Sequence, residues 1–297
     1  MMKNCLIVGL PDSGKSTYIG ALWHVVQNDA DKIDLSLIAS DDNLPNNTVQ
    51  LTALSKSWHN VEDMDRTSSD VPNSISLILR RKNEESEFTL NVPDFRGESI
   101  RQIVTKNQPQ EFDDWCQKAD SLLYMVANIH PGIYADDFIN DEDDEDDDEV
   151  TATKTQLKEV PPLEPKNMTP AALNMLLLRY LKEHVSCKKI VICLSAWDKI
   201  SRVSPCISPE NYLKGHSPAL YNFIKYHFPE TRFYGLSAQG EAYSYVEAGE
   251  GESKKKTVTV ECKKHLQDLT IKGERAFIYE DENLSYDITK PLAALLD

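Results

Sequence analysis

The sequence predicts an α/β fold, with one mixed, mostly parallel sheet and helices on both of its faces. Short, continuous apolar runs at residues 5–8, 121–128 and 189–194 are typical of buried parallel strands. Segments with apolar residues at helical spacing stand between these runs. A charged turn at 82–86 separates two more strand-like segments, and a hairpin there would make the sheet mixed.

Composition bounds the class of protein. The chain has 297 residues, and we expect one domain over 1–297. The net charge of −16 argues against non-specific nucleic-acid binding and against attraction to an anionic membrane. Six cysteines show no paired metal spacing, and no signal peptide or membrane-spanning run stands out. We therefore expect a cytoplasmic protein without membrane insertion.

The first strand leads directly into a glycine loop. Residues 9–16 read G-L-P-D-S-G-K-S, which fits the phosphate-binding pattern G-x-x-x-x-G-K-[ST]. Apolar residues at helical spacing follow the loop from Tyr18 to Val26. A loop that enters a helix N-terminus points several backbone N–H groups at one small volume, and the helix dipole adds positive potential there. This order predicts a site for a nucleotide's phosphates.

Each position of the loop has an expected role. Gly9 and Gly14 let the backbone curl closely around phosphates. Lys15 should reach the β- and γ-phosphates, and the Ser16 hydroxyl should bind Mg²⁺. The predicted nucleotide-binding residues of this loop are Gly9, Asp12, Ser13, Gly14, Lys15, Ser16 and Thr17.

A second motif follows the predicted hairpin of strands 75–80 and 88–92. Asp94 stands at the end of the second strand, three residues before Gly97. A carboxylate there can hold Mg²⁺ through water, and the Gly97 N–H can contact a γ-phosphate. Upstream, we expect a helix at 49–58 and a loop at 61–72. Residues 98–120 are expected to be helical.

The middle of the chain has a more acidic and more proline-rich composition than the rest of the chain. Residues 141–149 are an unbroken acidic run, and prolines follow at 161, 162 and 165. Like charges repel and proline excludes helix, so residues 134–167 are predicted to be a solvated, disordered insertion. Composition favours a solubilising loop over a docking tail for a basic partner.

The remaining elements complete the predicted sheet. A helix begins at Thr169-Pro170 and runs to about His184, and a further helix covers 210–228. The last core strand is expected at 232–236. Residues 241–275 are expected to form an extended hairpin or an insertion. A short amphipathic helix at 287–296 should pack back on the sheet.

The ordered motifs resemble those of the TRAFAC clade of small-GTPase-like P-loop domains. The phosphate loop comes first, D-x-x-G second, an Asp at a strand end at 198 third, and Ser237-Ala238 last. The residues around these motifs are most similar to those of the bacterial double-GTPase group of GTPase-associated conflict systems. The resemblance covers about residues 4–239 and the closing helix. It implies a guanine nucleotide, GTP or GDP, with Mg²⁺, and a protein effector or activating partner.

The resemblance also assigns the base site. The family's fourth motif is Asn or Thr, then Lys, any residue and Asp, and here it reads Ser195, Ala196, Trp197, Asp198. Only Asp198 is retained, so Trp197 or Lys199 would have to replace the Lys that packs over the base. Ser237 and Ala238 match the fifth motif, whose backbone N–H meets guanine O6.

The expected catalytic residues are Lys15, Arg66, Thr67, Gly97 and Glu98. Thr67 is the candidate for the switch threonine that binds Mg²⁺, and an ordinary loop threonine is an equally good interpretation. Arg66 beside it could bring a charge to the γ-phosphate. Glu98 stands where many relatives have a water-orienting Gln, and its charge should repel phosphate and slow hydrolysis. The expected metal ligands are Ser16, Thr67 and Asp94.

Three functions remain open from the sequence. The first is a Mg²⁺-dependent GTPase that acts as a molecular switch in a bacterial conflict or defence system, with a low intrinsic rate. The second is a scaffold that binds GTP and barely hydrolyses it. The third is an ATP-dependent P-loop kinase, which Asp198 and Ser237-Ala238 disfavour.

Overall fold

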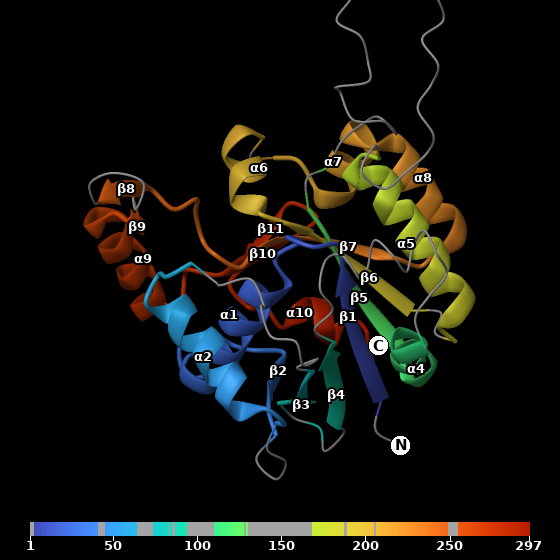
Figure 1. Ribbon diagram of the computed structural model, residues 1–297, viewed down its shortest axis with the longest axis horizontal. Helices are drawn as coiled ribbons and strands as arrows, with labels where there is room; N and C mark the ends of the chain where they lie inside the picture. Colours follow the sequence, from blue (N-terminus) through green and yellow to red (C-terminus); the bar gives the residue numbers. More distant parts are fainter. Residues whose placement is uncertain are drawn as a thin grey trace, which may run out of the picture.

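The computed structural model describes residues 3–40, 45–63, 74–82, 84, 87–93, 110–127, 129, 168–186, 189–204, 206–248 and 255–297. The strands within these ranges are β1 (Lys3–Gly9), β2 (Leu37–Ala39), β3 (Ile75–Arg81), β4 (Glu87–Val92), β5 (Ser121–Val126), β6 (Lys189–Ser195), β7 (Arg232–Ser237), β8 (Tyr245–Ala248), β9 (Lys255–Val258), β10 (Phe277–Glu280) and β11 (Asn283–Ser285). The helices are α1 (Lys15–Asn28), α2 (Thr48–His59), α4 (Gln110–Lys118), α5 (Pro170–His184), α6 (Trp197–Val203), α7 (Pro209–His216), α8 (Pro218–His227), α9 (Val260–Lys272) and α10 (Lys290–Ala293). Figure 1 shows one twisted sheet between two groups of helices.

The central sheet is mixed and mostly parallel at its centre. Among the described residues its strand order is β11-β10-β7-β6-β5-β1-β4-β3-β2. Strands β4, β1, β5, β6 and β7 run parallel, and β3, β2, β10 and β11 add antiparallel pairs at the two edges. Parallel strands need both faces covered, and β5 is accordingly buried along its whole length. The predicted α/β architecture is confirmed.

Two hydrophobic cores lie on the two faces of this sheet. One contains α1, α2 and α10, with Tyr18, Leu22 and Trp58 among its fully buried side chains. The other contains α4, α5, α7 and α8, with Phe112 and Leu177. Figure 1 shows the second group of helices on the right of the sheet and the first on the left. The parallel strands are held between these layers, so their carboxyl ends form a fixed edge for a site.

Two predicted elements were wrong in their extent. The single helix expected at 210–228 is two helices, α7 and α8, because Ser217 lies before Pro218 and has φ −146° and ψ 67°. The ring of a proline disfavours helical backbone in the residue before it. The strand at 232–236 is not the last of the core, since β10 pairs antiparallel with β7 through Ile278 and Leu236. The short sequence of β10 carries little periodic signal.

The C-terminal region forms a small unit beside the sheet and then returns to it through β10. In the range 241–275 the structure has the antiparallel pair β8–β9 and then helix α9, which lies beyond the edge of the sheet. Val61, Val258, Cys262 and Leu266 form a small core between this unit and the end of α2. The expected closing helix is only the four-residue α10, and it does pack on the sheet. Residues 134–167 lie outside the described residues.

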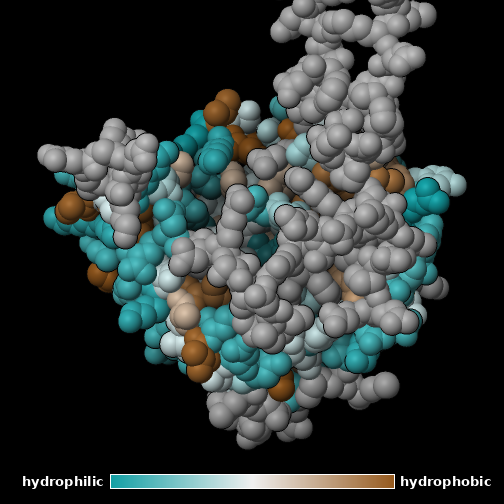
Figure 2. Space-filling model, viewed as in Figure 1, coloured by the Kyte–Doolittle hydropathy of each residue, from teal (hydrophilic) through white to brown (hydrophobic). Residues whose placement is uncertain are grey.

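The exposed large hydrophobic side chains are spread over several elements of the described surface. The largest exposed fractions belong to Val203, Tyr226 and Val49, which stand on three different helices. Over the coloured residues of Figure 2, brown positions are separated by teal ones. Scattered apolar residues of this kind are normal for a folded protein.

The burial of His24 should make the stability of the fold depend on pH. Its ring lies 5.0 Å from those of Trp58 and His59, and burial, opposed in part by Asp29, lowers its pKa from 6.5 to about 4. The unfolded chain therefore takes up a proton as the pH falls below about 6.5, and the folded chain does so only near pH 4. The free energy of unfolding should fall by about 1–2 kcal/mol between pH 7 and pH 5.

Urea denaturation at the two pH values measures this loss. In His24→Gln the loss should largely disappear, and in His216→Gln, which removes an exposed imidazole, it should persist. An unchanged loss in His24→Gln would assign the pH dependence to other groups.

Candidate functional site

The phosphate loop connects β1 to α1 as the sequence predicts. Gly9 must be glycine because a Cβ there would collide with the Met125 carbonyl oxygen of the neighbouring strand β5. Gly14 precedes α1 with φ 84°, a left-handed conformation that glycine adopts without strain. Asp12 also has a positive φ, 59°, at the exposed tip of the loop. The loop therefore curls back toward the sheet and opens at the N-terminus of α1.

Lys15 lies inside this loop. Its ammonium donates to the carbonyl oxygens of Gly9 and Leu10, both at 2.8 Å, and to Ser13 Oγ at 3.2 Å. Ser16 is exposed in the first turn of α1, and Thr17 is half-buried beside it. A helix N-terminus, an ammonium group and a hydroxyl group are the kinds of group that can bind a phosphate and its magnesium ion.

Ser195 braces the loop from the neighbouring strand end. Its hydroxyl donates to the Ser13 carbonyl oxygen at 2.7 Å. The missing lysine of the fourth motif predicts weaker support for the phosphate loop. The structure provides a support through the Ser195 hydroxyl instead, so Ser195 is a site residue that sequence reasoning missed. A hydroxyl donor at the end of a central strand was the available signal.

Asp198 lies in the first turn of α6, just after β6, and meets Ser237, the last residue of β7. Ser237 Oγ donates to Asp198 Oδ1 at 3.0 Å, and both side chains are buried. Burial raises the pKa of the Asp198 carboxyl, and the Ser237 hydrogen bond opposes that rise. Each carboxylate oxygen can accept more than one hydrogen bond, so the Ser237 contact leaves Asp198 able to accept from a ligand. Asp198 should lose its charge at a higher pH than an ordinary surface aspartate.

Trp197 cannot replace the missing lysine. Its side chain is 0 % exposed, and its ring packs where a Cβ on Gly235 would collide with it. It therefore lies against the sheet and not over a base. Within the described residues its Nε1 has no hydrogen-bond partner. Lys199, the other candidate, is exposed at the mouth of the site.

One cavity of about 670 Å³ joins the phosphate loop to the strand ends. Its size is within the range of small-molecule sites. The predicted residues that line it are Asp12, Ser13, Gly14, Thr17, Asp198, Lys199 and Ala238, and the unpredicted ones include Ser195, Tyr212, Gln239, Tyr243 and Tyr245. The structure therefore places residues predicted to bind the phosphates and residues predicted to bind the base around the same cavity.

Five predicted site residues lie outside the described residues: Arg66, Thr67, Asp94, Gly97 and Glu98. Strand β4, which leads toward Asp94, runs parallel to β1 and ends at Val92, so it ends at the same edge of the sheet as β1. In the described residues no group of three or more His, Cys, Asp or Glu side chains could hold a metal ion. A magnesium ion held by phosphate oxygens, water and the Ser16 hydroxyl requires no such group.

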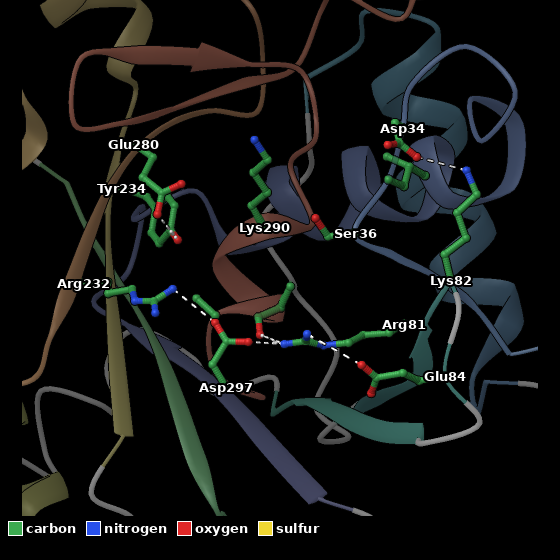
Figure 3. Close-up of a pocket in the computed structure, with 13 residues that line it drawn as sticks. Asp34, Ser36, Arg81, Lys82, Glu84, Arg232, Tyr234, Glu280, Lys290 and Asp297 are labelled. Carbon is green, nitrogen blue, oxygen red and sulfur yellow. Dashed lines mark hydrogen bonds and ion pairs between the residues drawn. The ribbon is translucent and has the colours of Figure 1, made fainter.

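A second cavity, of about 470 Å³, lies away from the phosphate loop (Figure 3). Arg232 begins β7 and Arg81 ends the antiparallel β3, which places them at the amino ends of the parallel strands. Both point at Asp297, and the Arg81 hydrogen bond lowers the pKa of that carboxyl. Lys82 pairs with Asp34 across the same cavity. Exposed pairs of this kind stabilise a fold weakly, and here they tie the C-terminal segment to β3 and β7.

Comparisons with known proteins give one family. The model of the Double-GTPase 1 family matches residues 6–295. No curated protein sequence matches the chain. No helix in the described part of the chain is long and apolar enough to span a membrane.

Solved structures resemble the chain more weakly. The S. cerevisiae Ski7 GTPase-like domain bound to GDP and inorganic phosphate is 17% identical with a TM-score of 0.40, over 80% of this chain and 43% of that one. The same domain bound to GTP is 16% identical with a TM-score of 0.40, over 84% and 47%. Methanosarcina barkeri Roco2 RocCORdC bound to GDP is 10% identical with a TM-score of 0.35, over 81% and 44%. The chain spans less than half the length of each of these structures.

The family match covers nearly the whole chain and includes the phosphate loop and the ends of β6 and β7. The sheet order and the glycine loop independently give an α/β P-loop fold. The chain belongs to the Double-GTPase 1 family.

Proposed function

We propose that this protein is a GTP-binding switch that hydrolyses GTP to GDP with Mg²⁺ at a low intrinsic rate. The observation that carries the proposal is the cavity that joins the phosphate loop to the buried Asp198–Ser237 pair. A carboxylate at that depth pairs with the two N–H donors on the edge of guanine, and adenine offers no such donors. The family membership supports the same choice of base.

Residues of the phosphate loop and of the segments around 66 and 94–97 are proposed to bind the γ-phosphate and its magnesium ion. Lys15 and the backbone N–H groups before α1 would neutralise the β- and γ-phosphates. Ser16 would bind Mg²⁺ directly, with Thr67 as a second ligand and Asp94 acting through water. Gly97 and Arg66 would contact the γ-phosphate. The bound ion would supply charge stabilisation for the transferred phosphoryl group.

The wider role is proposed from the resemblance, and the location from composition. We propose a cytoplasmic switch that forms a single domain over 1–297, in which composition predicts that the acidic stretch 134–167 is a solvated insertion. Its GTP-bound form would engage a protein effector or activating partner in a bacterial conflict or defence system. A GTP-binding scaffold without turnover is the alternative.

Nucleotide binding and turnover test the proposal together. Isothermal titration with GTP, GDP and ATP, with Mg²⁺ and with EDTA, should show a preference for guanine and tighter GTP binding with Mg²⁺. Steady-state phosphate release should then be slow. Binding of GTP without any release would favour the scaffold, and ATP binding equal to GTP binding would overturn the guanine assignment.

Glu98→Gln tests whether the charge of Glu98 slows hydrolysis. The amide can orient a water without repelling phosphate. We expect a higher single-turnover rate and an affinity for GTP that is similar or better. A rate decrease of about tenfold, which corresponds to about 1.4 kcal/mol of barrier, would make Glu98 a catalytic group instead.

A further inference from the structure

The backbone that carries the base-reading end is held from behind by side chains of distant segments. Trp58, in the last turn of α2, donates from Nε1 to the Ala238 carbonyl oxygen at 2.7 Å. Arg275, after α9, donates from Nε to the Gln239 carbonyl oxygen at 3.2 Å. Within the loop, the Gly240 N–H donates to Ser237 Oγ at 3.1 Å. The two carbonyl contacts hold the peptide groups that follow Ala238 and Gln239, and so restrict the loop that carries the Ala238 N–H from outside the cavity.

Arg275 connects this loop to two further segments. Its Nη1 donates to the Trp58 carbonyl oxygen at 2.5 Å, and its guanidinium carbon lies 4.1 Å from the centre of a Trp58 ring. Its Nη2 donates to the Tyr243 hydroxyl at 2.9 Å. Tyr243 lines the nucleotide cavity and is half-buried there. One side chain therefore fixes α2, the Ser237–Gly240 loop and a ring at the cavity wall.

The environment of Arg275 is costly for a charge. The side chain is 1 % exposed, and among the described residues it forms no ion pair with a carboxylate and donates to carbonyl and hydroxyl oxygens. A buried cation is tolerated only when its donors are satisfied with good geometry. Its planar guanidinium can reach several acceptors in fixed directions, which an ammonium cannot do. Arg275 thus fixes the directions of the groups that it contacts.

The space left by the missing lysine gives Tyr243 a role. Ala196 stands at that position with φ 55°, and its methyl group cannot cover a purine. Trp197 lies against the sheet, so it does not cover the base either. Tyr243 lines the cavity together with Ala238 and Asp198. An aromatic ring gains contact energy against a flat base.

We propose that Arg275 is a positioning residue for the purine base, which orients the Ser237–Gly240 loop and holds Tyr243 as the aromatic contact for that base. The inference rests on the proposed function, because it specifies how the same cavity recognises guanine. It adds a second set of specificity residues, supplied by the C-terminal unit, to the strand-end residues Asp198 and Ser237.

Three ligands distinguish an effect on base binding from an effect on phosphate binding. They are GTP, ATP and inorganic tripolyphosphate, each with Mg²⁺. In Tyr243→Ala the affinity for GTP should fall about tenfold or more, which corresponds to about 1.4 kcal/mol. In Arg275→Met the ratio of GTP to ATP affinity should also fall at least tenfold. Tripolyphosphate affinity should stay within about twofold of wild type in both, because the phosphate loop is untouched. Tyr243→Phe keeps the ring and removes the hydroxyl that Arg275 contacts. In this variant the ratio of GTP to ATP affinity should fall by less than it does in Arg275→Met.

Tyr226→Phe is the control. Tyr226 is an exposed tyrosine of α8 that does not line the cavity, so the ratio of GTP to ATP affinity in this variant should match wild type. A double-mutant cycle of Arg275→Met and Tyr243→Phe should be non-additive. If Arg275→Met does not fold, Arg275→Lys is used in its place, and the ratio of GTP to ATP affinity should again fall at least tenfold.

The outcomes distinguish this inference from the proposed function. The inference alone is overturned if wild type prefers GTP, Tyr243→Ala keeps the wild-type affinity for GTP, and the Arg275 variant keeps the preference for GTP over ATP. Equal loss of GTP and tripolyphosphate affinity also overturns it, because a purely structural role would produce that result. A wild type without preference for GTP overturns the proposed function itself.

Discussion

Lys15→Ala is expected to abolish measurable nucleotide binding while leaving the fold intact. The ammonium is the one side-chain cation of the described phosphate loop, residues 9–16, and charge-assisted hydrogen bonds to phosphate are among the strongest polar contacts in proteins. We expect at least a 100-fold loss of GTP affinity, about 2.7 kcal/mol. Titration calorimetry measures it, and the melting temperature without nucleotide checks the fold.

The control must remove a lysine without touching the loop. Lys118→Ala truncates an exposed side chain in the last turn of α4, and its GTP affinity should equal that of wild type. Lys15 also links the carbonyl oxygens of Gly9 and Leu10, so a small decrease in melting temperature is compatible with the assignment. Unchanged affinity in Lys15→Ala would exclude residues 9–16 as the phosphate site.

Asp198→Asn is expected to exchange the preferred base from guanine to xanthine. Guanine presents N1–H and an N2 amino group, and an ionised carboxylate can accept from both. Xanthine has a carbonyl oxygen in place of the amino group, to which the new amide can donate while it still accepts from N1–H. Sites built to hydrogen-bond a group discriminate by up to about 10⁴–10⁵ against analogues that lack it. We expect the ratio of GTP to xanthosine triphosphate affinity to fall by at least about 100-fold, because the buried position excludes compensating water.

A competition titration of both proteins against GTP, ATP and xanthosine triphosphate measures the exchange. Glu241→Gln is the matched control, since this carboxylate lines the same cavity but pairs with Arg202 at 2.9 Å. It should keep the wild-type preference. If Asp198→Asn shows no gain for xanthine, Asp198 is not the base reader, and only a generic nucleotide site at the phosphate loop remains.

Contacts between consecutive residues explain why some elements were predictable. The loop at 9–16, the N-cap of α5 and the hairpin of β3 and β4 depend on neighbours in the sequence. Thr169 Oγ1 accepts from the Ala172 N–H at 3.3 Å, as its position before Pro170 predicts. The break between α7 and α8 was also present locally, in Pro218, and was given too little weight against the apolar periodicity.

The edges of the sheet were less predictable. Strands β2, β10 and β11 are three or four residues long. So short a segment cannot establish a period. Strands β2 and β10 form on the edges that β3 and β7 offer, and β11 forms on the edge of β10. Their formation is a consequence of the assembled sheet.

The sequence by itself determined the α/β class, the phosphate loop and the position of Asp198 just after a central strand, because each depends on residues close together in the chain. Only the tertiary structure decided what surrounds them. Ser195 braces the loop from 182 residues away, and Arg275 reaches Trp58 across 217. Trp197 turns to the sheet because Gly235, on a neighbouring strand, leaves room for its ring. Such contacts depend on strand order and helix placement, which no local pattern of residues specifies.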